Sequence, residues 1–138
     1  MSVSILIVSH GQLAEQLIQI ATSTFGDAMP LQCRSLSVSQ TCDPDLIATA
    51  NADMISELDQ GDGVLILTDA YGSTPSNIAN RLAAIVTSKV IAGVNLPMLL
   101  RVFNYPEKSL EELSTTAFDG GKDGIIICSW VTIQSKKY

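Results

Sequence analysis

The sequence predicts an α/β protein of the doubly wound class, with a mainly parallel sheet and helices on both faces. Short apolar runs alternate with segments in which apolar residues recur every three or four positions, the pattern of strands separated by helices. The run at 64–67, Val-Leu-Ile-Leu, is apolar at every position, as expected of a central parallel strand buried on both faces. We expect the flavodoxin-like strand order 2-1-3-4.

The amino-terminal half is expected to supply two strands and two helices. The apolar run at 3–8 predicts the first strand, and the helical spacing of apolar residues over 13–21 predicts the helix that follows. Alternating apolar and polar residues at 31–38 indicate a half-buried strand near a sheet edge. The Asp-Pro-Asp sequence at 43–45 offers a capping residue, a proline and first-turn negative charge, so a helix is expected over 43–58.

The same alternation continues through the middle of the chain. A glycine-containing turn at 61–63 leads into the strand at 64–67. Thr74 and Pro75 then open a helix whose apolar residues extend to position 86. The apolar run at 90–94 predicts the fourth strand, so strand and helix still follow one another as a parallel sheet requires.

The final third of the chain is expected to add one helix and one strand. Helix is predicted from the region of Tyr105 and Pro106, with a capping box formed by Ser109 and Glu112. The glycine pair at 120–121 is expected to end this helix. The apolar run at 124–128 then predicts a carboxyl-terminal edge strand.

Length and charge limit the domain organisation and the partners. The 138 residues fit a single domain over 1–138, with a core over 1–128 and a carboxyl-terminal tail over 129–138. Fourteen acidic residues against eight basic ones give a net charge of −6. This balance argues against nucleic acid or an anionic membrane surface as a partner, because few cations are available to neutralise phosphates.

The sequence favours a cytoplasmic protein without a metal site. The amino terminus lacks the basic segment of a signal peptide, and no apolar run is long enough to span a bilayer. Cys33, Cys42 and Cys128 are odd in number and form no CxxC pair, which favours reduced thiols in a reducing compartment. With one histidine in the chain, we expect neither a metal site nor another cofactor.

Polar residues gather where the predicted strands end. His10 follows the first strand, Asp69 follows the third and Asn95 follows the fourth. In an open parallel sheet, chemistry takes place beyond the carboxyl ends of the strands, where the winding reverses. Strands one and three flank that point in the order 2-1-3-4, so His10 and Asp69 are expected to face each other. A carboxylate that accepts from one imidazole nitrogen leaves the other as a nucleophile.

Features suited to an added phosphate surround this pair. Two helices are expected to begin nearby, and helix amino termini offer free N–H groups to anions. Hydroxyl groups and glycines in the adjoining turns would add donors and allow a tight backbone. The predicted phosphate-binding residues are Gly11, Tyr71, Gly72, Ser73 and Thr74.

Each of these residues also has a purely structural interpretation. A lone histidine is more often structural than catalytic, although its place directly after a central strand and before glycine favours chemistry. Asp69 is compatible with a turn-capping role, and Thr74 with a helix cap. Asn95 fits a residue that satisfies loop backbone, and Met98 fits core or interface packing. The convergence of the polar residues on one sheet edge favours the functional interpretation.

Four segments in order resemble the IIA domain of the mannose-type sugar phosphotransferase system over nearly the whole chain. They are Ser-His-Gly at 9–11, Gly-Val-Leu-Ile-Leu-Thr-Asp at 63–69, Gly-Ser-Thr-Pro-Ser-Asn at 72–77 and Val-Ile-Ala-Gly-Val-Asn-Leu-Pro-Met-Leu at 90–99. The resemblance implies that His10 accepts a phosphoryl group from the phosphocarrier protein HPr and passes it to a IIB component. Asp69 matches the family's acidic partner of that histidine.

The resemblance also implies an assembly. Family members are homodimers in which a carboxyl-terminal strand can cross to the partner, and the stretch at 125–133 is apolar enough to supply one. The segment at 90–99 contributes the residues expected at a partner interface, and membrane contact is expected at most through a transporter. The interface residues are Asn95, Pro97 and Met98.

Some departures and rival functions stay open. Thr74 stands where the family usually has a serine, and Ala70-Tyr71 replaces a Thr-Trp pair of sugar-transporting members. Many relatives continue into a IIB domain, so the chain resembles either a separate transporter subunit or an orphan regulator. The rivals are a phosphoryl donor for dihydroxyacetone kinase and a non-catalytic dimerisation module. A histidine phosphatase is disfavoured because Ser9 replaces the expected arginine.

Overall fold

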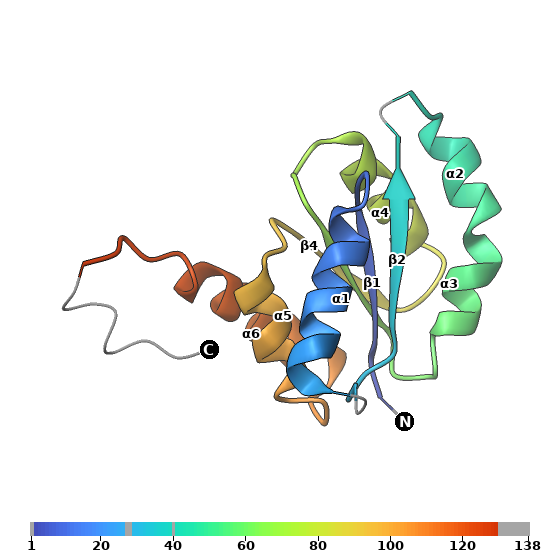
Figure 1. Cartoon of the computed structure of the whole chain (residues 1–138). Helices are drawn as coiled ribbons and strands as arrows, with labels where there is room; N and C mark the ends of the chain where they lie inside the picture. Colours follow the sequence, from blue (N-terminus) through green and yellow to red (C-terminus); the bar gives the residue numbers. More distant parts are fainter. Residues whose placement is uncertain (1, 27–28, 40, 130–138) are drawn as a thin grey trace.

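A computed structural model describes residues 2–26, 29–39 and 41–129 of the chain (Figure 1). Within these ranges the sheet has four parallel strands in the order β2-β1-β3-β4, which confirms the predicted doubly wound class and strand order. The order places β1 and β3 side by side at the centre of the sheet. The strands are β1 (Ser4–His10), β2 (Cys33–Val38), β3 (Val64–Thr68) and β4 (Ser88–Ala92).

Helices cover both faces of this sheet (Figure 1). Alternate residues of the central strands are buried in two separate apolar clusters, because successive strand side chains point to opposite faces. Among the described residues, no helix is both long and apolar enough to cross a membrane. One face is covered by α1 (Leu13–Phe25), α5 (Leu96–Phe103) and α6 (Leu110–Asp123), and the other by α2 (Pro44–Ala50), α3 (Ala52–Leu58) and α4 (Thr74–Ala83).

Helix caps predicted from the sequence are present. The Asp43 side chain accepts a hydrogen bond from the Asp45 N–H at the start of α2. At the start of α6, the Ser109 hydroxyl accepts from the Glu112 N–H, and the Glu112 carboxylate accepts from the Ser109 N–H. Both caps satisfy N–H groups that a helix leaves without an internal partner. The predicted capping box is therefore confirmed.

The single helix predicted over 43–58 is wrong, because two helices meet at Asn51. The Asn51 side-chain amide donates to the Ile47 carbonyl at 2.9 Å, and the Asn51 backbone N–H donates to the same oxygen at 3.2 Å. Asparagine competes in this way with helical backbone bonding. Asn51 consequently ends α2 and begins α3.

Two features near the carboxyl terminus differ from the prediction: α5 was not predicted, and α6 continues past its predicted end. The glycine pair does not end α6, because Gly120 and Gly121 lie inside the helix where it packs on α5. A Cβ atom at Gly120 would lie 2.8 Å from the Arg101 Cβ, and one at Gly121 would lie 2.8 Å from the Met98 Cε. These glycines permit close helix packing, and α6 ends at Asp123.

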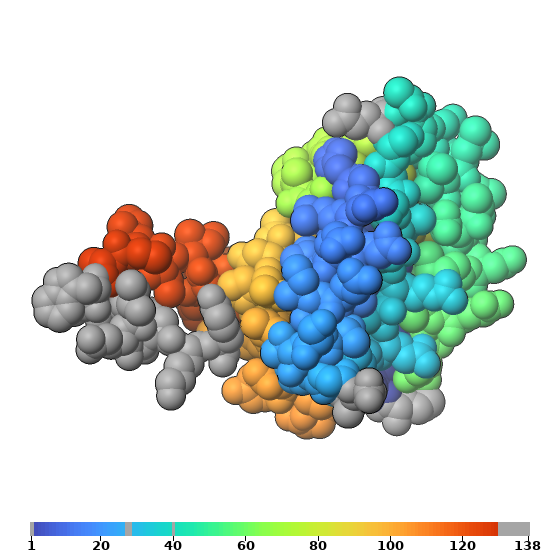
Figure 2. Space-filling model, in the orientation of Figure 1, coloured from blue at the N-terminus to red at the C-terminus, as the bar shows by residue number. Residues whose placement is uncertain are grey.

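The strand predicted at 124–128 is absent from the described residues, whose sheet ends at β4. The chain leaves α6 and projects from the body of the molecule, as the red segment of Figure 2 shows. The side chains of Ile125 and Ile127 are 78% and 95% exposed. A strand needs a partner edge for its backbone groups, and this segment lies against none within the described chain. Residues 130–138 of the predicted tail lie outside the described residues.

Gly63→Ala is expected to lower the free energy of unfolding by roughly 2 kcal/mol, because it combines backbone strain with a clash. Gly63 has φ +92°, and an added Cβ would lie 2.9 Å from the Thr87 carbonyl oxygen, which is backbone and cannot rotate away. Urea unfolding measures the change. The matched control is Gly26→Ala, at φ +68° with no atom within 4 Å of the added Cβ. Equal losses in the two variants would show that the clash at Gly63 contributes nothing.

Candidate functional site

The structure brings His10 and Asp69 together at the carboxyl ends of β1 and β3. The His10 Nδ1 lies 2.7 Å from the Asp69 Oδ2, and the His10 backbone N–H donates to the same oxygen at 2.8 Å. The side chains are 36% and 10% exposed, respectively, so the ring is accessible while the carboxylate is largely enclosed. Within the described residues, no hydrogen bond involves the His10 Nε2.

Hydrogen bonds keep the Asp69 carboxylate charged. Partial burial on its own raises the pKa of Asp69, but the bonds from the His10 N–H, the His10 ring and the Ala70 N–H outweigh that effect. The net result is a pKa below the ordinary aspartate value. The Ala70 N–H donates to Oδ1 at 2.9 Å, so both carboxylate oxygens are engaged. Asp69 is thereby fixed as an acceptor for the ring.

The first turn of α4 presents unused N–H groups at this edge of the sheet. Within the described residues, the backbone N–H groups of Thr74 and Ser76 make no hydrogen bond, and Pro75 between them has none to offer. Such groups carry the partial positive charge of a helix amino terminus. The turn that leads into α4 uses Gly72 at φ +79°, which only glycine adopts readily.

The three predicted hydroxyl donors differ in their surroundings. The Ser73 hydroxyl donates to the Ala70 carbonyl at 2.6 Å, so the donor expected for phosphate is used within the loop. Tyr71 is 90% exposed at the tip of this loop. Thr74 is half-buried. Among these side chains, Thr74 is therefore placed best for a group bound at the start of α4.

The start of α1 contains a contact that sequence reasoning missed. The Ser9 hydroxyl is buried and accepts a hydrogen bond from the Ala14 N–H at 2.8 Å, so one N–H of the first turn is already satisfied. Gly11 has φ +50° and donates its N–H to the Val38 carbonyl. A serine five residues before a helical alanine is the only signal in the sequence. The Ala14 N–H is therefore not available to a bound anion.

The three residues predicted at a partner interface make contacts inside this chain. The Asn95 side chain caps α5 by accepting from the Met98 N–H and donates to the Gly121 carbonyl at 3.0 Å. Met98 is 3% exposed, so its side chain packs in the core of this chain, and a role in partner contact stays a prediction. Pro97 packs against Gly124 at the end of α6, where an added Cβ would clash with the Pro97 Cβ.

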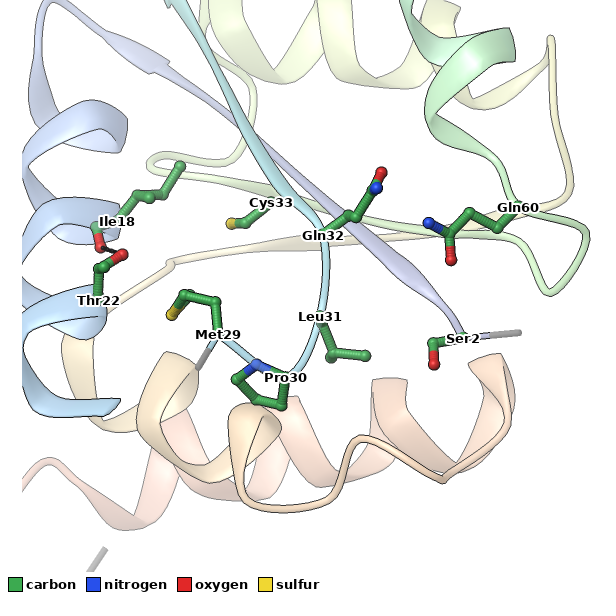
Figure 3. Close-up of a pocket in the computed structure, with 9 residues that line it drawn as sticks. All are labelled: Ser2, Ile18, Thr22, Met29, Pro30, Leu31, Gln32, Cys33 and Gln60. Carbon is green, nitrogen blue, oxygen red and sulfur yellow. Dashed lines mark hydrogen bonds between the residues drawn. The ribbon is translucent and has the colours of Figure 1, made fainter. Parts of the chain in front are cut away.

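Figure 3 shows a separate pocket, lined by residues at the amino ends of β1 and β2. The His10–Asp69 pair lies at the opposite, carboxyl ends of the strands. Cys33 lines the pocket, and burial raises the pKa of this thiol to about 12, which makes the thiol unreactive at neutral pH. Its lining side chains carry no charge, so the pocket is unsuited to phosphate. The lining residues are Ser2, Ile18, Thr22, Met29, Pro30, Leu31, Gln32, Cys33 and Gln60.

Sequence comparison identifies the family. Residues 4–117 match the EIIA-man family profile, described as the fructose IIA component of the phosphotransferase system. The chain is 34% identical over 131 residues to the mannose-specific EIIAB component of Escherichia coli strain K12, and this alignment covers 91% of the chain. The match covers 39% of that relative, so the chain spans less than half the length of the relative.

Solved structures share the fold. The mannose/sorbose-specific IIA subunit of Enterococcus faecalis superposes with a TM-score of 0.78 at 22% identity, over 94% of this chain and 96% of that one. A phosphotransferase EIIA component of Streptococcus agalactiae gives a TM-score of 0.74 at 22% identity, over 91% and 96% of the two chains. The family profile covers most of the chain, and the chain therefore belongs to the mannose-type family of phosphotransferase-system IIA components.

Proposed function

We propose that this chain is a phosphoryl carrier that accepts a phosphoryl group from phosphorylated HPr on His10 and passes it to a IIB component. The observation that carries the proposal is the 2.7 Å contact between His10 Nδ1 and Asp69 Oδ2 at the carboxyl edge of the central strands. This contact leaves Nε2 as the accessible nitrogen of a half-exposed ring. The proposed exchange with these carriers implies a cytoplasmic location.

Asp69 selects the reactive form of the imidazole. Because its pKa is lowered, Asp69 is ionised at neutral pH and accepts a hydrogen bond from a protonated Nδ1 of His10. With the proton on Nδ1, the free lone pair of the neutral ring is on Nε2. That lone pair attacks phosphorus, and the bond between phosphorus and the donor breaks with its electron pair staying on the donor. The phosphorylated ring keeps the Nδ1 proton and gains positive charge, which the Asp69 carboxylate stabilises.

The first turn of α4 supplies the stabilisation that phosphoryl transfer needs. Catalysis of this transfer depends on positioning and on donors aimed at the phosphoryl oxygens. The free N–H groups of Thr74 and Ser76 and the Thr74 hydroxyl are such donors, while Gly11 and Gly72 keep the approach unobstructed. Exposed Tyr71 borders the same site, where a docking protein would meet it.

Incubation of the full chain with enzyme I, HPr and radiolabelled phosphoenolpyruvate tests the proposal. We expect one phosphoryl group per chain, labile to acid and stable to base, as a phosphohistidine is. Subsequent addition of a mannose-type IIB component is expected to remove the label. An unlabelled chain beside fully labelled HPr would refute the carrier function, and label that is stable to acid would assign the group to a residue other than His10.

We further propose that two copies of the chain assemble through the segment at 124–129. Its Ile125 and Ile127 side chains are mostly exposed, and within the described residues the outer edge of β4 has no paired strand. An unpaired strand edge and an exposed apolar segment are complementary when a second copy supplies one to the other.

Ile127→Asp is therefore expected to shift the chain from dimer to monomer, because it places a charge in the proposed apolar contact. Light scattering after size-exclusion chromatography measures the mass. Leu46→Asp is the matched control, since Leu46 is 68% exposed on α2, on the other face of the sheet. A wild-type monomer, or a dimer that survives in Ile127→Asp, would contradict this mode of assembly.

A further inference from the structure

Thr68 carries a buried hydroxyl close to the site of the proposed reaction. The residue ends β3 directly before Asp69, and it is 0% exposed. Its Oγ1 atom is enclosed and has no protein hydrogen-bond partner in the described part of the chain. Its backbone, by contrast, is well bonded, since the Thr68 carbonyl accepts from the N–H groups of Gly93 and Val94.

Strand geometry places this hydroxyl on the His10 side of the sheet. Thr68 pairs with Val8 in the register of β1 and β3, so the two side chains lie on the same face. His10 is two residues beyond Val8, and strand alternation directs it to that face as well. From strand spacing and rise, the Cα atoms of Thr68 and His10 lie roughly 8 Å apart, a distance that a phosphorylated histidine side chain spans.

Within the described residues, no hydrogen bond accounts for this hydroxyl in the unphosphorylated protein. The rest of β3 is Val-Leu-Ile-Leu and fully buried, and valine has nearly the shape of threonine without its polar atom. A buried hydroxyl without a partner costs free energy, and such groups in native proteins are rare enough to require an explanation. Functional sites are where such costs are usually found.

We propose that Thr68 is a phosphate-binding residue whose hydroxyl gains its partner on phosphorylation, by donating a hydrogen bond to a phosphoryl oxygen on His10. This inference rests on the proposed carrier function. The His10 ring shifts enough to admit the phosphoryl group above Thr68, and the free N–H groups of Thr74 and Ser76 at the start of α4 complete its surroundings. The hydroxyl then favours the phosphorylated state over the unphosphorylated one.

The test combines a stability measurement with a transfer equilibrium in the full chain. Thr68→Val is expected to leave the Tm of the unphosphorylated protein unchanged or to raise it, because an unpaired buried hydroxyl is removed. The same variant is expected to reduce roughly tenfold the equilibrium constant for phosphoryl transfer from HPr, since a hydrogen bond to a charged group is lost. Thr68→Ser is expected to restore the equilibrium constant.

Thr116→Val is the matched control, because Thr116 is a buried threonine on α6 whose hydroxyl has partners. It donates to the Glu112 carbonyl at 3.0 Å and accepts from the Lys108 Nζ at 2.9 Å. This variant is expected to lower the Tm and to keep the wild-type transfer equilibrium.

Two results would overturn the inference while leaving the carrier function intact. One is a wild-type transfer equilibrium in Thr68→Val. The other is a Tm decrease in Thr68→Val as large as in Thr116→Val, which would show that the hydroxyl already has a partner, such as a buried water. A wild-type chain that takes no label is a different failure, because it removes the proposed carrier function itself.

Discussion

Phosphoryl acceptance from HPr is expected to disappear entirely in His10→Ala, the largest effect predicted for any single substitution. His10 is the only histidine in the chain, and in the proposed reaction its Nε2 supplies the electron pair for the new bond to phosphorus. No neighbouring side chain can replace it, because Asp69 is held as a hydrogen-bond acceptor by His10 and Ala70. Radiolabel from phosphoenolpyruvate measures the loss.

The same variant separates chemistry from folding. His10 is partly exposed at the end of β1, so we expect His10→Ala to keep the wild-type circular dichroism spectrum and to unfold cooperatively. Acid-labile label on a folded His10→Ala protein would assign the phosphoryl group elsewhere. If the variant and the wild type are equally unlabelled and bind HPr equally well, a non-catalytic interaction module becomes the better account.

Asp69→Asn is expected to slow phosphoryl acceptance roughly 10²-fold, the loss typical of a group that orients or protonates a reacting partner. An amide cannot hold the Nδ1–H of His10 with the charge of a carboxylate, so the reactive tautomer and the charged ring both lose stabilisation. Stopped-flow or quenched-flow labelling measures the rate. Asp59→Asn is the matched control, since Asp59 accepts backbone N–H bonds from Gly61 and Gly63 far from the site.

The lowered pKa of Asp69 also gives this pair a dependence on pH. The folded-state pKa lies below the unfolded value of about 3.9, so the carboxylate stabilises the fold above that pH and loses this effect as the pH falls through the folded pKa. The difference in Tm between wild type and Asp69→Asn is therefore expected to be full at neutral pH and to shrink below about pH 4. A difference that is constant down to the most acidic conditions would show that charge is not involved.

Periodicity and strand ends were sufficient to predict the layers of this fold and the pairing of His10 with Asp69. Parallel strands of fixed order bring their carboxyl ends to one edge, so two polar residues on adjacent strands had to meet there. The Asp43 and Ser109 caps were predictable for a different reason, because each uses residues only two or three positions apart.

Tertiary packing decided the features that sequence reasoning missed. A pair of glycines is typical of a helix end, so the sequence predicted that α6 stops there. The close approach of Arg101 and Met98 explains why these glycines lie inside the helix. Asn95 followed by Pro97 carried a capping signal that could have revealed α5, as Asp43 and Pro44 did for α2. The unpartnered Thr68 hydroxyl had no signal at all, since an unsatisfied group is recognised only once its surroundings are known.

Asp69 links the state of His10 to the exposed loop that follows β3, because its two carboxylate oxygens bond to both. Transfer in one direction requires that the phosphoryl donor bind the unphosphorylated chain better, and that the acceptor bind the phosphorylated chain better. Asp69 Oδ2 holds both the ring and the backbone of His10, while Oδ1 holds Ala70 in the loop that displays Tyr71. If His10 is phosphorylated as proposed, the charge on its ring changes, and the carboxylate that contacts the ring is the same one that anchors this exposed loop.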